Sequence, residues 1–182
     1  MHRLLTLLAL VLLAQPVLAQ DDVADSRLDA LFEDLAEADE PGWKRIEEAI
    51  WEEWSETGSP ALDYLLTRGR EALSAGDDVA AIEHFTALIE NAPDFPEGYN
   101  ARATAYFDAE LYGPALSDIA RTLTLEPRHF GALSGLGLIL EETGNKQRAL
   151  EAFRAARAIH PHRPDLREAV ERLEAELQGS AI

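Results

Sequence analysis

Residues 133–161 read LSGLGLILEETGNKQRALEAFRAARAIHP, and this stretch decides the fold. Apolar residues recur at helical spacing in its first half, stop at Gly144 and Asn145, and resume from Leu150. This spacing predicts two amphipathic helices joined by a short turn. Gly135 and Gly137 lie inside the first helix, where each glycine costs about 1 kcal/mol relative to alanine. The pattern therefore raises the question of what requires glycine at these positions.

The same pattern occurs three times with a period of 34 residues. Three markers keep this period: a proline, an alanine and, four residues after the alanine, a large apolar residue. They are found at Pro93, Pro127 and Pro161, at Ala81, Ala115 and Ala149, and at Phe85, Ile119 and Phe153. A fixed period in this range is the signature of a repeat architecture. We expect three helix-turn-helix units, over residues 61–94, 95–128 and 129–162.

The pattern resembles the tetratricopeptide repeat family, whose unit of about 34 residues has W-x2-L-G-x2-Y, then A-x3-F, then P. The third unit matches at Leu133, Leu136, Gly137, Leu140, Ala149, Phe153 and Pro161. No unit has the tryptophan, and Arg68 and Arg102 replace the expected leucine. The resemblance implies an all-α solenoid in which small residues let paired helices approach and large ones fill the space between units. The small residues are Gly69, Ala103 and Gly137, and the large ones are Phe85, Ile119 and Phe153.

Helical flanks are predicted on both sides of the units. Residues 163–178 have the apolar stripe and charged face of a capping helix, followed by a tail over residues 179–182. Residues 20–60 form an acidic helical flank that contains all three tryptophans, Trp43, Trp51 and Trp54, in one helix. Trp51 and Trp54 lie one period before Phe85 and Leu88, which favours a degenerate leading repeat. Two alternatives stay open: rings packed against the first repeat, or an exposed aromatic partner surface.

Residues 1–19 are typical of a secretory signal peptide, with a basic start, an apolar run, and Val17 and Ala19 before a polar change. We expect cleavage after Ala19, no stable membrane insertion thereafter, and a periplasmic or secreted location. The alternative is an uncleaved anchor, but the apolar run is short of the roughly 20 residues of a span. The chain has no cysteine, which suits a bacterial periplasm better than a disulfide-stapled extracellular module.

The formal net charge is −18, which disfavours nucleic acid and anionic lipid as partners. The excess is uneven: residues 20–60 hold fourteen acidic and three basic side chains, whereas residues 128–178 hold eight of each. A solvated acidic face, a basic partner, and a fold-back of the flank onto the C-terminal end are the alternatives.

No catalytic or metal site is predicted, and no cofactor is expected. The histidines His84, His129, His160 and His162 lack the spacing of a metal motif. Ser134 lacks the first glycine of G-x-S-x-G, and the glycines match no phosphate-binding loop. We therefore expect a protein that is not an enzyme.

The resemblance also implies a concave groove, lined by the first helix of each unit, that binds a peptide or a partner helix. By the family register its residues are Leu66, Arg70, Leu73, Asn100, Thr104, Phe107, Ser134, Leu138 and Glu141, with Gly135 nearby. Only Arg70 and Asn100 resemble the family's carboxylate clamp, so chaperone tails are not expected as ligands. An interaction module of the bacterial envelope is the leading hypothesis. The alternatives are an enzyme or accessory subunit of envelope polymer metabolism, using Glu52 or Glu53, and self-association through the tryptophan helix.

Overall fold

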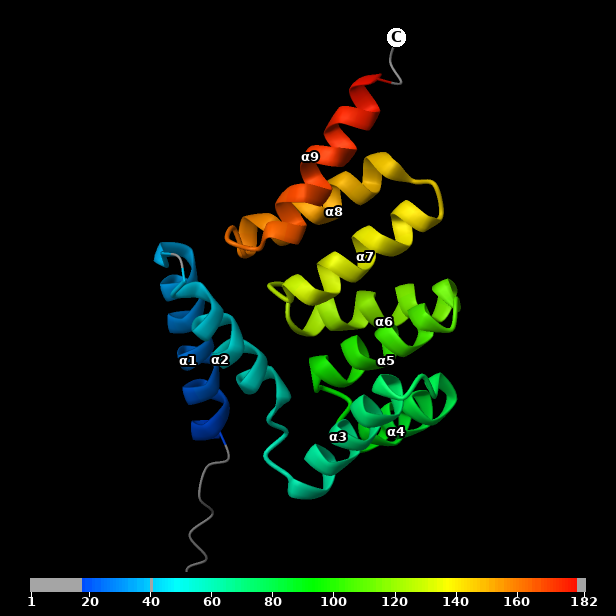
Figure 1. The fold of residues 1–182 in the computed structure, drawn as a ribbon. Coiled ribbons are helices and arrows are strands. Elements are labelled where there is room, and N and C mark those ends of the chain that lie inside the picture. The colour runs from blue at the N-terminus through cyan, green and yellow to red at the C-terminus, as the bar shows by residue number, and fades with distance from the viewer. Residues whose placement is uncertain (1–17, 40, 180–182) are drawn as a thin grey trace, which may run out of the picture.

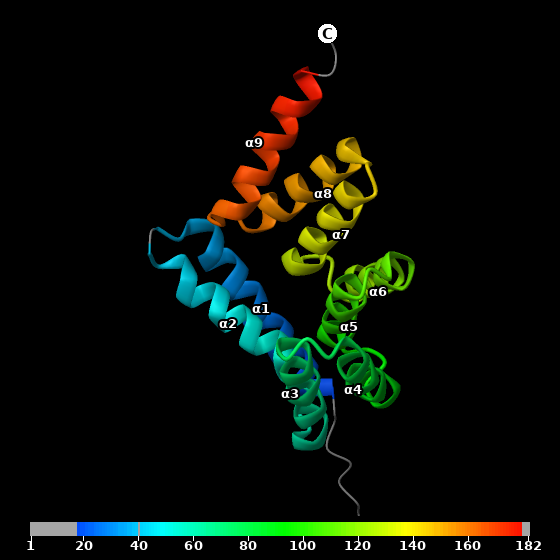
Figure 2. The same cartoon turned by 45° about the vertical axis from the view of Figure 1, so that its right-hand side comes forward.

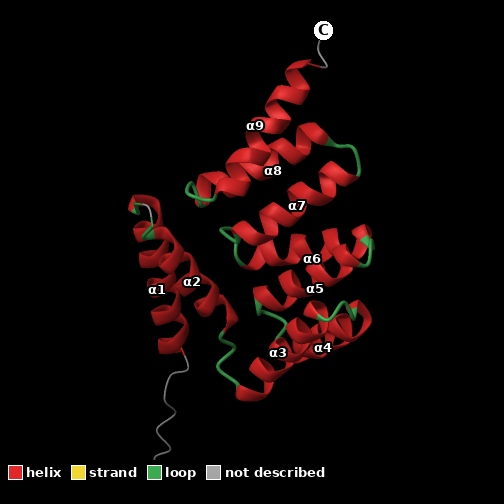
Figure 3. Cartoon of the chain, viewed as in Figure 1, coloured by secondary structure: helices red, strands yellow, loops and turns green. Residues whose placement is uncertain are grey.

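The computed structural model describes residues 18–39 and 41–179, and all regular structure in these ranges is helical (Figure 3). The all-α prediction is confirmed. Residues 1–17, which carry most of the predicted signal peptide, and residues 180–182 of the tail lie outside the described residues. Within the described ranges, no helix is both long enough and apolar enough to cross a membrane.

Three helix pairs stack into a curved array (Figures 1 and 2). The pairs are α3 (Pro60–Ser74) with α4 (Asp78–Asn91), α5 (Pro96–Asp108) with α6 (Tyr112–Leu125), and α7 (Phe130–Glu142) with α8 (Lys146–Ile159). Each predicted unit thus contains one pair. The final helix, α9 (Pro164–Gly179), lies where the capping helix was predicted and buries Leu166, Val170 and Leu173 against α8.

The turns inside the pairs depend on residues with positive φ. Gly76 and Gly144 end the first helices of the outer pairs with φ of +74° and +80°, a region that favours glycine. In the middle pair Glu110 takes this role with φ of +58°. All three turns are short, so paired helices lie antiparallel and in close contact.

Close packing explains the glycines that recur with the period. A Cβ atom at Gly69 would lie 2.2 Å from the Phe85 ring, and one at Gly137 would lie 2.7 Å from the Phe153 ring. Only glycine fits at such distances, so the close-packing prediction is confirmed at these positions. Arg102, which replaces the expected leucine of the second unit, forms a bidentate pair with Asp118 of α6 at 2.7 and 2.9 Å.

The N-terminal flank forms a helical hairpin of α1 (Leu18–Glu37) and α2 (Trp43–Ser55). Its closed end lies beside the α8–α9 turn, and its open end leads into α3 (Figures 1 and 2). The hairpin therefore lies on the concave side of the array and does not stack below α3 and α4. The prediction of a degenerate leading repeat is wrong in this respect, because the rings of Trp51 and Trp54 contact His129 and Phe130 of the third unit.

Candidate functional site

The first helices α3, α5 and α7 line the side of the array that faces the hairpin (Figure 2). The predicted groove residues come from these helices but do not all reach the surface. Leu66 is buried in the core between the first two units, and the partly buried Leu73 packs against the same core. Leu66 is therefore unavailable to a ligand, contrary to the prediction, because its side chain fills the space between α3, α4 and α5.

Arg70 and Asn100, the clamp-like pair, both bind a carboxylate of the chain itself. The Arg70 guanidinium donates to one Glu97 oxygen at 2.7 Å, and the Asn100 amide donates to the other at 2.9 Å. The Arg70 guanidinium also donates to the Ser55 hydroxyl of the hairpin at 3.0 Å. Thus the two groove residues that resemble a carboxylate clamp are already paired with an internal acid.

Glu97 is almost fully buried, and burial alone raises the pKa of a carboxyl group. The hydrogen bond and electrostatic attraction of His129, followed by those of Arg70, outweigh burial and hold the pKa of Glu97 below its ordinary value of 4.5. Glu97 is therefore an anion held by side chains from three helices.

His129 joins the groove to the hairpin. Its Nδ1 accepts a hydrogen bond from the Ala132 backbone N–H at 3.1 Å, so the ring caps the start of α7. The other ring nitrogen lies 3.2 Å from Glu97, and the ring stacks on Trp54 with centroids 4.0 Å apart. Sequence reasoning missed both His129 and Glu97, since a histidine before a helix and an acid in a first turn each fit a solvated position.

The tryptophans of α2 lie at the contact between the hairpin and the array. Trp43 and Trp54 are buried and Trp51 is partly buried, so the predicted exposed aromatic surface is not formed. The tryptophan rings therefore pack in the core, but they pack against the third unit and not against the first repeat. Trp43 lies edge-on to His160, and the tip of the Trp51 ring would lie 2.7 Å from a Cβ at Gly131.

Ion pairs support the same contact. The Arg128 guanidinium binds the Asp29 carboxylate at 2.7 Å and lies over the Phe32 ring. Arg163 reaches Glu47 at 3.4 Å. The acidic flank therefore folds back on basic residues of the α6–α7 turn and of the α8–α9 turn, one of the alternatives raised by the charge distribution. The rest of its acids include exposed residues such as Glu33, so a solvated acidic face coexists with this contact.

The remaining groove residues lie farther along α5 and α7. Thr104 is exposed, Phe107 is partly buried against Tyr112, and Leu138 is exposed. Glu141 is paired with Arg172 of α9. This part of the groove is not covered by the hairpin contacts described above.

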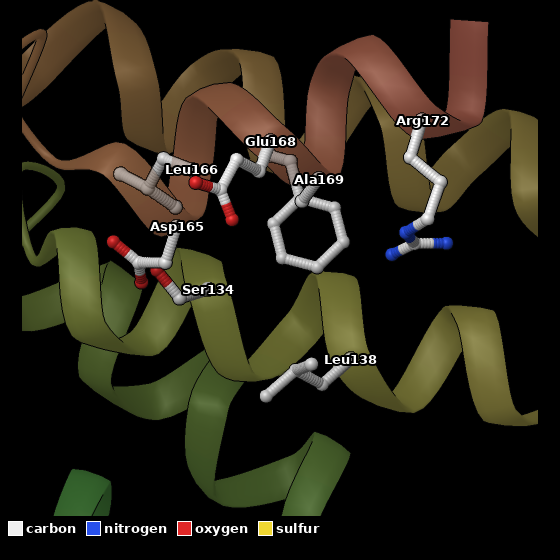
Figure 4. A pocket seen from close by; sticks show the side chains of 8 residues that line it. Ser134, Leu138, Asp165, Leu166, Glu168, Ala169 and Arg172 are labelled. Atoms are coloured by element: carbon white, nitrogen blue, oxygen red, sulfur yellow. The ribbon is translucent and has the colours of Figure 1, made fainter. Parts of the chain in front are cut away.

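Ser134 and Leu138 line a cavity of about 470 Å³ between α7 and α9 (Figure 4). Its other lining residues are Phe153, Asp165, Leu166, Glu168, Ala169 and Arg172. In Figure 4 the carboxylates of Asp165 and Glu168 lie toward the Ser134 end, and the Arg172 guanidinium lies at the other end. The cavity thus has apolar walls and charges of both signs around them, as binding pockets for side chains do.

Of the residues considered for chemistry, His160 and His162 lie close to each other, with ring centroids 6.3 Å apart. No cluster of metal-ligating side chains occurs in the described part of the chain. Glu52 is exposed, and Glu53 pairs with Arg27 of α1 at 2.9 Å. His160 and His162 lie against Trp43.

The fold and the cavity define an α-solenoid with a partly open concave face. A tetratricopeptide repeat model matches residues 100–164. A TPR repeat-containing protein of Rhizobium etli is 36% identical over 155 residues, which are 85% of this chain and 76% of that protein. The chain belongs to the tetratricopeptide repeat family.

Solved structures show the same fold at lower identity. The TPR domain of Sgt2 from Aspergillus fumigatus superposes with a TM-score of 0.63 at 22% identity, over 68% of this chain and 83% of that one. The first TPR domain of Spaghetti (RPAP3), bound to the HSP90 peptide SRMEEVD, superposes with a TM-score of 0.62 at 20% identity, over 64% of this chain and 95% of that one.

Proposed function

We propose that this chain is a non-catalytic interaction module of the bacterial cell envelope that binds a peptide segment or a partner helix on its concave face. The observation that carries the proposal is the cavity between α7 and α9, where the exposed Leu138 lies beside the apolar wall of Phe153, Leu166 and Ala169. An apolar side chain of a partner would be removed from water there, at about 25 cal/mol per Å² buried. The family membership supports a binding role, since repeat solenoids present extended concave surfaces.

The ligand differs in chemistry from an acidic C-terminal tail. In this chain Arg70 and Asn100 hold the Glu97 carboxylate, so a peptide carboxylate would have to displace a buried internal anion. Displacement would leave Glu97 without two of its partners, which is costly for a buried charge. Tails such as SRMEEVD, bound by the Spaghetti domain, are therefore not the proposed ligands.

The envelope location rests on residues 1–19 and on the lack of cysteine. It is tested by expressing the full chain with a C-terminal tag in a bacterial host, followed by cell fractionation. Recovery in the periplasm with residues 1–19 removed is expected. Recovery of the uncleaved chain in the cytoplasm contradicts the location without affecting the binding proposal.

The binding proposal is tested by placing a photo-crosslinking amino acid at Leu138 of the full chain in living cells. A matched control carries it at Val79, which is exposed on α4 outside the groove. We expect an adduct with one distinct protein from position 138 only, and a several-fold weaker adduct when Phe107→Ala is added. Equal adducts from both positions contradict the proposal, and an adduct of this chain with itself supports self-association instead.

A further inference from the structure

Several buried polar groups at the contact between the hairpin and the array have no hydrogen-bond partner. The indole N–H groups of Trp43 and Trp54 are buried without a hydrogen-bond partner, and so are both ring nitrogens of His160, of which Nε2 lies 3.7 Å from a Glu47 carboxylate oxygen. All of these groups lie where α2 meets the third unit or the α8–α9 turn. Buried polar groups without partners cost free energy, and native cores contain few of them. This contact is therefore less well satisfied than the contacts within the array.

The hairpin also has a core of its own. One cluster of buried apolar residues contains Leu28, Phe32, Leu35, Trp43, Ile50 and Trp54 from the hairpin, and Phe130 as the buried contribution of the array. Phe130 belongs to none of the clusters that hold the repeat units together. The hairpin thus binds the array around Phe130 and the buried rings of His129 and His160, as a ligand binds around a hot spot.

The surface under the hairpin continues the open groove. Phe130, Ser134 and Leu138 are spaced by four residues and therefore lie along one face of α7. Leu138 is exposed at one end of this stripe, whereas Phe130 is fully buried at the other end, under the rings of Trp51 and Trp54. The hairpin occupies the continuation of the groove in which the proposed partner binds.

The connection to α3 permits the hairpin to move as a unit. Within the described residues, the backbone connects the hairpin to the array only through residues 56–59. Gly58 has φ of +74°, and Thr57 is held by Asp63 of α3 through its backbone N–H at 3.0 Å and its hydroxyl at 2.7 Å. A change of dihedral angles at Gly58 would swing the hairpin away from the array and would separate Thr57 from Asp63, so opening costs these two hydrogen bonds.

From these observations we propose that the α1–α2 hairpin is an internal ligand of the concave face, and that the partner binds by replacing it with a segment of similar chemistry. That segment is an acidic amphipathic helix with two aromatic side chains three residues apart, as in Trp51 and Trp54. Its acidic side chains form ion pairs with Arg128 and Arg163, which are now paired with Asp29 and Glu47 of the hairpin. The inference rests on the proposed function, because it concerns the same groove.

The test uses the full chain and a dye-labelled synthetic peptide of residues 26–56 as the probe. The release variant carries Asp29→Arg and Trp51→Ala, which remove the pair with Arg128 and the ring over Gly131. The matched control carries Asp34→Arg, the same charge change at an exposed position of α1. Circular dichroism checks that the array stays helical, and Trp43 and Trp54 emission reports whether the hairpin has left. If the release variant unfolds, Asp29→Arg alone takes its place.

By fluorescence anisotropy we expect the release variant to bind the peptide at least tenfold more tightly than wild type or the control. Adding Phe130→Ala should abolish binding, and a peptide with both Trp51 and Trp54 replaced by alanine should not bind. Equal affinity for all proteins, failure to bind a released variant, or a hairpin that stays docked in both release variants overturns the inference. A dimer that exchanges hairpins, seen by sedimentation, also overturns it. The adduct at Leu138 is a separate readout, so either idea can fail without the other.

Discussion

At the scale of single residues, the glycines of α7 have three different neighbours. A Cβ at Gly131 would meet Trp51 of the hairpin at 2.7 Å, and one at Gly137 would meet the Phe153 ring of α8 at 2.7 Å. At Gly135 the nearest atom would be Cδ1 of Ile119 at 3.5 Å, an ordinary contact. Gly135 thus faces α6 and not the groove, near which the family register placed it. Two of the three glycines are required by close contacts, and the third is not.

Gly135→Ala should therefore stabilise the protein. The helix interior favours alanine by about 0.5–1 kcal/mol, and the space toward Ile119 accepts a methyl group. Urea unfolding followed by circular dichroism measures the change. Gly137→Ala is the matched comparison, and we expect it to destabilise by about 1–3 kcal/mol because the Phe153 ring has to shift. Destabilisation by both substitutions to the same extent contradicts this account of Gly135.

Gly131→Ala should act on the hairpin and leave the array unchanged. The added methyl group overlaps the tip of the Trp51 ring, so we expect that ring to move and its emission to shift to longer wavelength. Far-UV circular dichroism should stay as in wild type. With Gly135→Ala as the control, an unchanged emission spectrum in Gly131→Ala would show that Trp51 does not pack on α7.

At the scale of elements, one buried carboxylate connects the first helices of all three units. Glu97 of α5 is bound by Arg70 of α3, by Asn100 of its own helix and by His129 at the start of α7. Repeat arrays are held mainly by contacts between neighbouring units. This network adds a polar contact across all three, directly beside the hairpin.

The network gives the protein an acid-sensitive element. Because the folded pKa of Glu97 is lowered below 4.5, its contribution is complete above the unfolded value and is lost as the pH falls through the folded value. In Glu97→Gln we expect about 1–3 kcal/mol lower stability near neutral pH and a smaller further loss on acidification than in wild type. Urea unfolding at about pH 6 and about pH 3 measures both effects, since these values lie on either side of the ordinary carboxyl pKa values of about 3.9 for Asp and about 4.3 for Glu.

Glu151→Gln, at an exposed position of α8, is the control for this pH comparison. It should lose as much stability between the two pH values as wild type does. If Glu97→Gln shows the same loss as this control, Glu97 does not carry the acid sensitivity.

The helix pairs could be predicted from sequence and the hairpin position could not, for a physical reason. The 34-residue period records contacts between neighbouring helices, such as Gly69 with Phe85 and Gly137 with Phe153, so it encodes the array locally. The contact of Trp51 with Gly131 joins segments far apart in sequence and follows no period. Extending the period to Trp51 therefore suggested a leading repeat where a folded-back hairpin exists. The charge difference between flank and third unit was the available signal for the fold-back.

The candidate site could be predicted in part for the same reason. Leu138, which the family register assigns to the groove, is exposed and lies beside a cavity. The register also places Leu66 in the groove, but this side chain is buried, because a register fixes the position along a helix and not its neighbours. Glu97 and His129 were missed, since their roles arise only when three helices and the hairpin come together.

At the scale of the whole molecule, the chain consists of a continuous array and a hairpin with its own small core. The array is held by contacts between successive helices, whereas the hairpin meets it around Phe130, the rings of His129 and His160, a few ion pairs and several unsatisfied polar groups. Elements with few buried contacts open at lower free energy than the core. The hairpin should consequently be the first part of the molecule to separate.

Denaturant unfolding followed by two probes should show this order. All three tryptophans lie in α2, so their emission reports on the hairpin, whereas far-UV circular dichroism is dominated by the longer array. We expect the emission change to have its midpoint at a lower urea concentration than the loss of helix. Coincident transitions would indicate a single cooperative unit and contradict a hairpin that opens separately.

A covalent link between the hairpin and the array should remove this difference. The chain has no cysteine, so Asp29→Cys and Arg128→Cys create unique sites where two side chains, 99 residues apart in sequence, now lie 2.7 Å from each other. A short bis-maleimide closing such a loop stabilises by at most about 4–5 kcal/mol in the chain-entropy model. The linked protein should show coincident probe transitions at higher urea than the same variant before linking, which serves as its control.

The link should also prevent binding of the peptide of residues 26–56. If linked and unlinked proteins give equal amounts of the partner adduct at Leu138, the hairpin does not have to leave for the partner to bind.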